Sequence, residues 1–501
     1  MPATSETTLS ENRTDLCIPD GTAGVGAANK GVLPTPDPTI YDHGLGEVTL
    51  LPPDGNDMDI LWETPCLDFG NLLYSSSLFI HGITLDDSLV LSGDEYQALS
   101  HYQDTFISDR VLKTPRWSMF GCIFRSVAHV PMAMHLLIAI ASMDLNQRSP
   151  RPAISLSVTR THFRKGSEML IQRMNLDSEP DHFSILSSWL FLYLCMTHRD
   201  ILNKKAIDRL STAIANYIQR YDLDRLGAGI MSKEQALTTV SRDTSRPMEP
   251  GLIGRLLLFL ASEDIRMGFE QCGGHLAHRL STNEGMYWRL YSQQRYILER
   301  YWGQEYPEHE VMHDVETAAA MELGHKVGLL VHRVNGLSKD VSEEAKPRDF
   351  DIEKGIVETE REYSSIFRLT RSSTASRSPF LRVAEVAVIS FYFVQLYYFR
   401  LTINNGTAPT PPYIMLTLAE LMSLAHRALN EQDHWGHGIF DLPLFMAAIE
   451  TKDRIHVEWI LPRISTVRFR TALSQVIFIQ DQTGNRLSIA RIRRILESPV
   501  T

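Results

Sequence analysis

Two runs of mostly apolar residues constrain the fold of this 501-residue chain more than any other feature. They cover residues 183–196 and 386–399, fourteen positions each. A helix needs roughly 18 to 20 apolar residues to cross a bilayer, so neither run is long enough. Because both runs are apolar on nearly every face of a helix, we expect them to be buried central helices of a soluble protein with no membrane contact.

Helical patterns continue along most of the chain from residue 92 onward. Ser92 and Glu95 have the Ser-x-x-Glu spacing of a capping box, which predicts a helix that reaches about residue 112. Pro131 suits the first turn of a helix, and a strongly helix-forming apolar segment follows it. Further helices are predicted at about 155–176, 182–199, 203–221, 252–270, 285–301, 311–335, 350–371, 379–402, 412–432, 441–450, 453–462, 465–479 and 488–497.

Strand patterns are scarce. Only 329–331 and 476–479 look strand-like, and both lie in helical contexts. Polar stretches at 225–250 and 335–346 suit surface loops better than domain boundaries. We therefore expect one all-α domain, a large bundle of antiparallel helices, over residues 92–501.

The first sixty residues have a different composition. They carry ten Asp or Glu against two Lys or Arg, and so hold eight of the eleven net negative charges of the chain. They are rich in Thr, Pro, Gly and Asp and show no sustained period. This predicts a disordered acidic tail over 1–60, joined to the helical domain by a connecting segment, 61–91. Acids interspersed with Ile, Tyr and Leu are typical of segments that contact coactivators, while the alternative is a tail that only adds solubility.

Charge and cysteine content argue against unaided DNA binding. Nucleic-acid binding needs clustered Lys and Arg that displace counterions from phosphate, and basic patches are few here. The five cysteines lie far apart without a CxxC pair, so neither a zinc cluster nor a disulfide framework is indicated. The first residues lack the basic and apolar regions of a secretory signal, and we expect reduced, intracellular cysteines. The cysteines are Cys17, Cys66, Cys122, Cys195 and Cys272.

Two stretches carry recognisable residues in the first part of the helical region. Residues 95–108 contain the pair His101 and Tyr102, and an apolar helix rich in small residues follows at 131–145. Residues 255–274 carry Asp264 in mid-helix and end in glycines. A structural role is the simplest interpretation of Asp264, either exposed on its helix or buried beside an Arg.

A third stretch, 441–464, contains Pro443, Leu444 and Phe445, then Glu450, a charged turn and an aromatic helix. In order and spacing the three stretches resemble the fungal-specific transcription factor domain, the regulatory middle region of zinc binuclear cluster regulators. Leu442 stands where that family usually has Trp. The resemblance covers residues 92–497 and implies a helical regulatory domain.

The resemblance implies a nuclear transcriptional regulator or coregulator that is not an enzyme and that controls a set of genes, among them its genomic neighbours. The family binds DNA through six cysteines that hold two zinc ions, and no such module is present in this sequence. We therefore expect no direct nucleic-acid binding, and a protein partner, either a DNA-binding transcription factor or a coactivator. A homodimer and a small-molecule effector are further expectations. No catalytic residue, cofactor or metal ligand is expected.

Other function classes stay open. In one, the chain is a small-molecule-binding accessory protein that kept the fold, with the aromatic segment 391–399 lining an apolar cavity. In another, His309, Glu310 and His313 form the H-E-x-x-H signature of a zinc hydrolase. Pro307 places that motif at a helix start, which favours a solvated turn. The residues available as a third ligand are Glu322 and His325.

Two more groups of residues have both a structural and a functional interpretation. His426, Asp433, His434 and His437 could share a metal, although the neighbouring glycines favour a polar turn. A lysine pair in mid-chain and an arginine group near the C-terminus could join a nuclear-import surface, although solvated helix faces are the commoner explanation. These basic residues are Lys204, Lys205, Arg491, Arg493 and Arg494.

Overall fold

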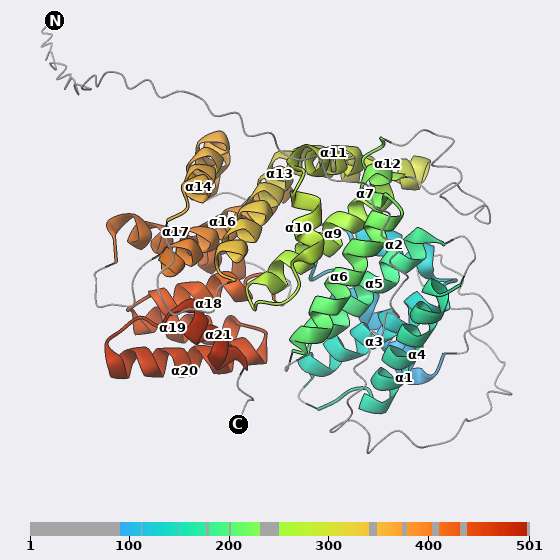
Figure 1. The fold of residues 1–501 in the computed structure, drawn as a ribbon, viewed down its shortest axis with the longest axis horizontal. Coiled ribbons are helices and arrows are strands. Elements are labelled where there is room, and N and C mark those ends of the chain that lie inside the picture. The colour runs from blue at the N-terminus through green and yellow to red at the C-terminus, as the bar shows by residue number, and fades with distance from the viewer. Residues whose placement is uncertain are drawn as a thin grey trace, which may run out of the picture. The chain divides into compact units, whose positions relative to one another are not determined.

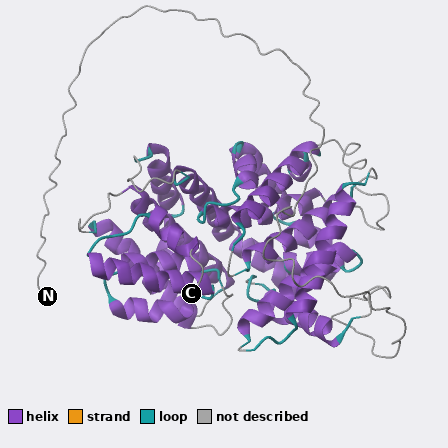
Figure 2. Cartoon of the chain, turned by 60° about the horizontal axis from the view of Figure 1, so that its bottom comes forward, coloured by secondary structure: helices purple, strands orange, loops and turns teal. Residues whose placement is uncertain are grey.

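The computed structural model describes ten segments of the chain. All of the regular elements in these segments are helices, which confirms the expected all-α fold (Figure 2). The predicted tail, 1–60, and nearly all of the connecting segment lie outside the described residues. The described segments are 91–111, 113–149, 151–176, 180–199, 202–230, 250–339, 348–372, 378–402, 410–430 and 438–497.

The helices fall into an earlier and a later group along the chain (Figure 1). The earlier group is α1 (Gly93–His101), the π-helix η2 (Tyr102–Phe106), the 3-10 helix η3 (Pro115–Trp117), α2 (Met119–Val127), α3 (Pro131–Arg148), α4 (Leu156–Met174), α5 (His182–Thr197), α6 (Lys204–Arg220), α7 (Leu223–Gly227), α9 (Pro250–Gly268), α10 (His275–Ser281), α11 (Glu284–Gln294), α12 (Ile297–Trp302) and the 3-10 helix η4 (Gly303–Glu305). The later group is α13 (Glu308–Leu337), α14 (Phe350–Glu362), α15 (Ser364–Ser372), α16 (Pro379–Thr402), α17 (Pro412–Asn430), α18 (Asp441–Glu450), α19 (Arg454–Ile460), the 3-10 helix η5 (Leu461–Arg463), α20 (Val467–Thr483) and α21 (Ile489–Glu497).

Local signals explain many of the helix starts. The capping box at α1 is confirmed: the Ser92 N–H donates to Glu95 Oε2 at 2.6 Å, and the Glu95 N–H donates to Ser92 Oγ at 3.4 Å. Pro131 stands in the first turn of α3, as predicted. Side chains of Asp or Asn cap several other helices, because they accept from the otherwise unpaired first N–H groups. These caps are Asp181, Asn203, Asn283, Asp349 and Asp453.

The sequence prediction missed three short helices and merged two pairs. α2, α7 and α10 were not predicted, since five to nine residues give little periodic signal. The helix expected at 285–301 is divided at Tyr296 into α11 and α12, and that at 350–371 is divided at Tyr363 into α14 and α15. In both cases an aromatic residue leaves helical geometry, with ψ of 27° and 22°.

The hydrophobic core consists of two clusters. The first is built around α3 and α5, and the second around α16, which packs against α13, α17 and α18. α13 contributes residues to both clusters. α16 is long and apolar enough to cross a membrane by length and composition, but 67% of its most apolar window is buried inside the structure, as in a core helix. Both apolar runs are thus central helices, as the sequence predicted.

Buried arginines from the last helices connect the two groups. Arg468 on α20 donates to Glu270 Oε1 at 2.7 Å, and Arg493 on α21 donates to the Phe269 carbonyl at 2.5 Å and to the Ser338 carbonyl at 2.9 Å. The interpretation of Arg493 as part of a solvated basic face is wrong, because only 2% of its surface is exposed. Its guanidinium is needed to satisfy carbonyl groups inside the protein.

Candidate functional site

The most unusual backbone feature of the described residues directly follows α1. The helix does not end at His101 but passes into the π-helical segment η2, where the Ile107 N–H donates to the Tyr102 carbonyl at 3.0 Å. Tyr102 and Phe106 point into the core, while Asp104 is exposed. Single π-helical turns are rare and are frequent at functional sites, so the surroundings of η2 are the first place to search.

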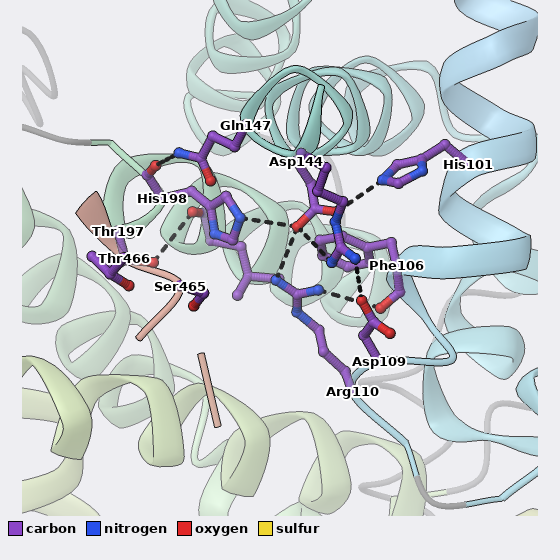
Figure 3. A network of polar contacts seen from close by, with 12 residues as sticks. His101, Phe106, Asp109, Arg110, Asp144, Gln147, Thr197, His198, Ser465 and Thr466 are labelled. Atoms are coloured by element: carbon purple, nitrogen blue, oxygen red, sulfur yellow. Dashed lines mark hydrogen bonds and ion pairs between the residues drawn. The ribbon is translucent and has the colours of Figure 1, made fainter. Parts of the chain in front are cut away.

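A buried polar network, the Asp144 network, lies on the inner side of η2 (Figure 3). Asp144, on α3, is 2% exposed. Its Oδ2 accepts from His101 Nε2 at 2.8 Å and from Arg148 Nε at 2.7 Å, and its Oδ1 accepts from His198 Nε2 at 3.1 Å. Figure 3 shows the two histidines approaching the carboxylate from opposite sides. Arg110 lies 3.7 Å from Asp144 Oδ1.

Opposing charges hold the Asp144 network together. Burial alone would raise the pKa of Asp144, but hydrogen bonds from His101 and His198 and the charge of Arg110 hold it well below its usual range. Burial lowers the pKa of His198, against the hydrogen bond to Asp144 that raises it. A second carboxylate, that of Asp109, pairs with Arg148, with its Oδ2 atom 2.5 Å from Arg148 Nη1. Because Asp144 is closed off from solvent, this network positions helices and does not suit catalysis.

An open cleft of about 570 Å³ lies on the outer side of η2. We call it the η2 cleft. Four segments form it: η2 with the two residues after it, η3, α2, and the end of α12 with η4. Its lining residues are Gln103, Asp104, Ile107, Ser108, Thr114, Pro115, Arg116, Gly121, Phe124, Arg125, Trp302 and Glu305.

The wall formed by η3 is packed directly against α2. A Cβ atom on Gly121 would lie 2.4 Å from the Pro115 carbonyl oxygen and 2.5 Å from that of Arg116, so only glycine allows this approach. The Ser118 hydroxyl accepts from the Gly121 N–H at 3.1 Å and donates to the Pro115 carbonyl at 2.7 Å. The Arg116 guanidinium lies over the Trp117 ring at 4.5 Å. The wall therefore presents a cation from a fixed backbone.

The adjoining wall is aromatic. The Trp302 ring meets the Trp117 ring edge to face with centroids 4.8 Å apart, and the Arg125 guanidinium lies 4.7 Å from the Trp302 centroid. Arg125 also pairs with Glu305 at 3.2 Å at the rim. The Trp302 Nε1 atom is buried, and within the described part of the chain it has no hydrogen-bond acceptor. A buried donor without an acceptor is uncommon and opposes folding, since its hydrogen bond to water is lost without replacement.

The H-E-x-x-H residues do not meet as metal ligands. The His309 side chain is 73% exposed, whereas Glu310 is buried with its Oε2 3.6 Å from Lys113 Nζ. The expectation of a solvated helix start is therefore wrong for Glu310, whose charge is balanced from another segment. Across the described ranges, no group of three His, Cys, Asp or Glu side chains has an arrangement that could hold a metal ion.

The two residues considered as a third ligand have other partners. His325 Nδ1 is 2.9 Å from the Tyr287 hydroxyl, and burial lowers its pKa to about 4. Glu322 Oε1 accepts from the Tyr363 hydroxyl at 3.1 Å. In the other histidine cluster, His426 stacks on Trp459 with centroids 5.4 Å apart, while residues 433, 434 and 437 lie outside the described residues.

The family-like stretches place polar residues at buried helix junctions. Asp264 is fully buried and accepts from the Tyr193 hydroxyl at 2.8 Å and from the Ala277 N–H at 2.9 Å. Its partners are a tyrosine and a backbone amide, and not the arginine considered from the sequence. Asp441 accepts from the backbone N–H groups of Ser465 and Thr466, both at 2.9 Å. These side chains connect α9 with α5 and α10, and α18 with the start of α20.

Glu450 is buried in an ion pair with Arg400. Burial raises the pKa of Glu450, and the charge of Arg400 opposes that shift. Leu444 and Phe445 are fully buried in the second core cluster, as expected for anchoring residues. The third family-like stretch is therefore architectural.

Sequence reasoning did not find the Asp144 network or the η2 cleft. One signal was present: Asp144 is the single acid in the apolar run 131–145, and a buried acid requires a partner. The η2 cleft had no such signal, because its lining residues come from segments up to two hundred positions apart.

Comparison with protein-family models, with curated proteins and with solved structures gives no match for this chain.

Proposed function

We propose that this chain is a nuclear transcriptional regulator or coregulator of the fungal type, which acts by binding and not by catalysis. Three stretches that resemble the fungal-specific transcription factor domain support this proposal. The observation that carries it is the position of their polar residues. His101 and Asp264 each form a buried junction between helices that are distant in the sequence, and Asp441 joins α18 to the start of α20. Scattered chance similarities would fall on exposed positions as often as on such junctions.

The proposal includes a DNA-binding protein partner. Cys122, Cys195 and Cys272 are buried thiols, and burial raises the pKa of each to about 12. Zinc binds the thiolate form, so these three residues are unsuited to a zinc cluster. The acidic segment 1–60 would repel DNA phosphate, whereas its charge suits contact with a coactivator.

Promoter occupancy in cells, compared with DNA binding by the purified chain, tests this proposal. A tagged chain should accumulate in the nucleus and associate with promoters in chromatin immunoprecipitation, with the largest transcript changes at those genes in a deletion strain. The purified chain alone should leave the same promoter fragments unshifted in gels. A variant with the ten acids of residues 1–60 changed to Asn or Gln should keep promoter association but lose activation if the tail recruits coactivators.

Two outcomes would contradict the proposal in different ways. Nuclear exclusion with unchanged transcripts would favour a small-molecule-binding accessory protein. Sequence-specific DNA binding by the purified chain would remove the need for a partner. The accessory alternative is favoured by one observation, the η2 cleft. The cavity expected at 391–399 does not support it, because Phe391 packs on Phe367 at 4.9 Å and Phe393 stacks on Tyr397 at 5.6 Å in the core.

A zinc hydrolase is the remaining alternative, and metal analysis of the purified chain tests it. The pairing of Glu310 with Lys113 opposes this alternative, since a general base must reach the metal-bound water. An equivalent of tightly bound zinc that is lost in a variant with His309 and His313 both changed to Ala would support it.

A further inference from the structure

We infer that the η2 cleft binds a small amphipathic zwitterion: an apolar, preferably aromatic, body that carries a carboxylate and an amine. This inference rests on the geometry of the cleft and not on the proposed regulatory function. The volume of about 570 Å³ lies within the range of roughly 300 to 1,000 Å³ usual for ligand pockets.

The charges of the cleft favour a zwitterion over an anion or a cation. Four charged residues line it, and two of them, Arg125 and Glu305, pair with each other at 3.2 Å. Arg116 has no carboxylate partner in the described parts of the chain, and its guanidinium rests on the Trp117 ring. Asp104 has no cationic partner there, and its carboxylate accepts only from the Ser100 hydroxyl at 2.9 Å. One cation and one anion thus face the same cleft without pairing to each other.

Guanidinium groups bind carboxylates through two parallel hydrogen bonds, so Arg116 is the expected partner of the ligand carboxylate. Asp104 would accept from the ligand amine. The exposed ion pair of Arg125 and Glu305 adds little net charge or binding energy to the cleft, since the two charges cancel and exposed ion pairs are weak and screened. It therefore does not decide the charge of the ligand.

The base of the cleft is apolar and suits an aromatic body, while Gln103, Ser108 and Thr114 add polar groups to the lining. Ile107 and Phe124 are each 2% exposed and Trp302 is 6% exposed, so the cleft has a well-packed base. The Trp302 ring supplies part of that base, and the charged contacts come from Asp104 and Arg116. η2 and η3 supply Asp104 and Arg116 respectively, so the bound molecule would bridge the two segments.

Three probes that share an indole body separate the contributions: L-tryptophan, indole-3-propionate, which lacks the amine, and tryptamine, which lacks the carboxylate. Binding to the full chain is measured by titration calorimetry, and by the shift of the melting temperature. We expect L-tryptophan to bind at least tenfold more tightly than either analogue, because each missing charge-assisted contact contributes about one factor of ten.

Two charge variants assign the ends of the ligand. Arg116→Gln should weaken L-tryptophan binding about tenfold and leave tryptamine unchanged. Asp104→Asn should weaken L-tryptophan binding, since the amine of this probe loses a charged acceptor. It should not weaken the binding of indole-3-propionate, because the carboxylate of that probe then faces no negative charge at position 104. Arg289→Gln, an exposed arginine on α11 outside the cleft, is the matched control and should bind all three probes like the wild type.

Several results would overturn the inference. One is the absence of heat and of a melting shift for all three probes up to roughly 10 mM, where even weak specific sites begin to fill. Another is equal or stronger binding of indole-3-propionate, which would make the cleft an anion site. A third is L-tryptophan binding unchanged in both charge variants while they melt like the wild type. None of these outcomes affects promoter association, so failure here is distinguishable from failure of the proposed function.

Discussion

Asp144 has more charged and polar partners than any other carboxylate discussed above. Two imidazoles and two guanidiniums converge on it from α1, the residues after η2, α3 and the end of α5. A buried carboxylate of this kind contributes to folding only while its partners compensate the loss of water. His101 before η2 and Arg110 after it both contact Asp144, so this carboxylate connects the two ends of η2 to α3.

We expect Asp144→Asn to lower the free energy of unfolding by about 3 to 5 kcal/mol, because Arg110 and Arg148 lose the charge that compensates their burial. Urea unfolding at pH 7 measures the loss. Glu168→Gln is the control: its pair with Arg164 is 3.9 Å long and about half exposed, so the change should be within about 0.5 kcal/mol. Equal losses in both variants would contradict the central role of Asp144.

For single residues, the sequence predicted which apolar side chains are buried better than it predicted which charged side chains contact each other. The anchoring roles of Leu444 and Phe445 were predicted because large apolar residues in a helical pattern are usually buried. The burial of Glu310 and Arg493 was not predicted. Charged residues are expected at the surface, and the distant segment that supplies an opposite charge or a carbonyl group is not evident from the sequence. Periodicity contains no information about such pairings.

At the scale of elements, the contact of η3 with α2 leaves no space for a side chain at Gly121. Gly121→Ala would place a methyl group against two backbone carbonyl oxygens, which cannot move without displacing η3. We expect a loss of about 1 to 3 kcal/mol in unfolding free energy, as for overpacked sites, and weaker ligand binding in the η2 cleft.

The matched control for that substitution is Gly93→Ala at the start of α1, where nothing lies within 4 Å of an added Cβ. Alanine loses less backbone entropy than glycine on folding, so this variant should be neutral or slightly more stable. Thermal melts of the two variants measure the contrast. Similar melting temperatures for both would mean that η3 is not held against α2 in solution.

The sequence predicted most long helices within a few residues, since their caps and periodic patterns are local. It did not predict η2. The capping box at Ser92 and Glu95 sets where α1 begins, whereas the change to a π-turn places Tyr102 and Phe106 together in the core, where their rings stack. Such a change follows from tertiary contacts, and a local pattern cannot contain it.

At the scale of the whole described region, two core clusters are joined by buried arginines. Arg468 contacts Glu270 with both side chains only 5% exposed. We expect Arg468→Met to cost about 3 to 5 kcal/mol, because Glu270 is left buried without its partner. Adding Glu270→Gln should recover part of that loss, and urea unfolding of the three variants measures the coupling. Additive losses would mean that the pair does not connect the clusters.

Histidines buried in the neutral form should make the whole fold sensitive to acid. Burial is the largest cause that lowers the pKa of His182, His325 and His332 to about 4, against 6.5 in the unfolded chain. A lowered histidine pKa means that the unfolded state binds the proton first. Stability from these residues is therefore complete above pH 6.5 and is lost as the pH falls from 6.5 toward 4.

Each of these histidines contributes a slope of up to about 1.4 kcal/mol per pH unit over that window. The urea midpoint should therefore begin to fall near pH 6.5, at a higher pH than the range near pH 4 in which ordinary carboxylates become protonated. His325→Phe should reduce the slope, because phenylalanine does not bind a proton. An aromatic ring also suits the site, since the Tyr291 centroid is 4.7 Å from that of His325. A midpoint independent of pH over this window would show that these histidines reach solvent or become protonated within the fold.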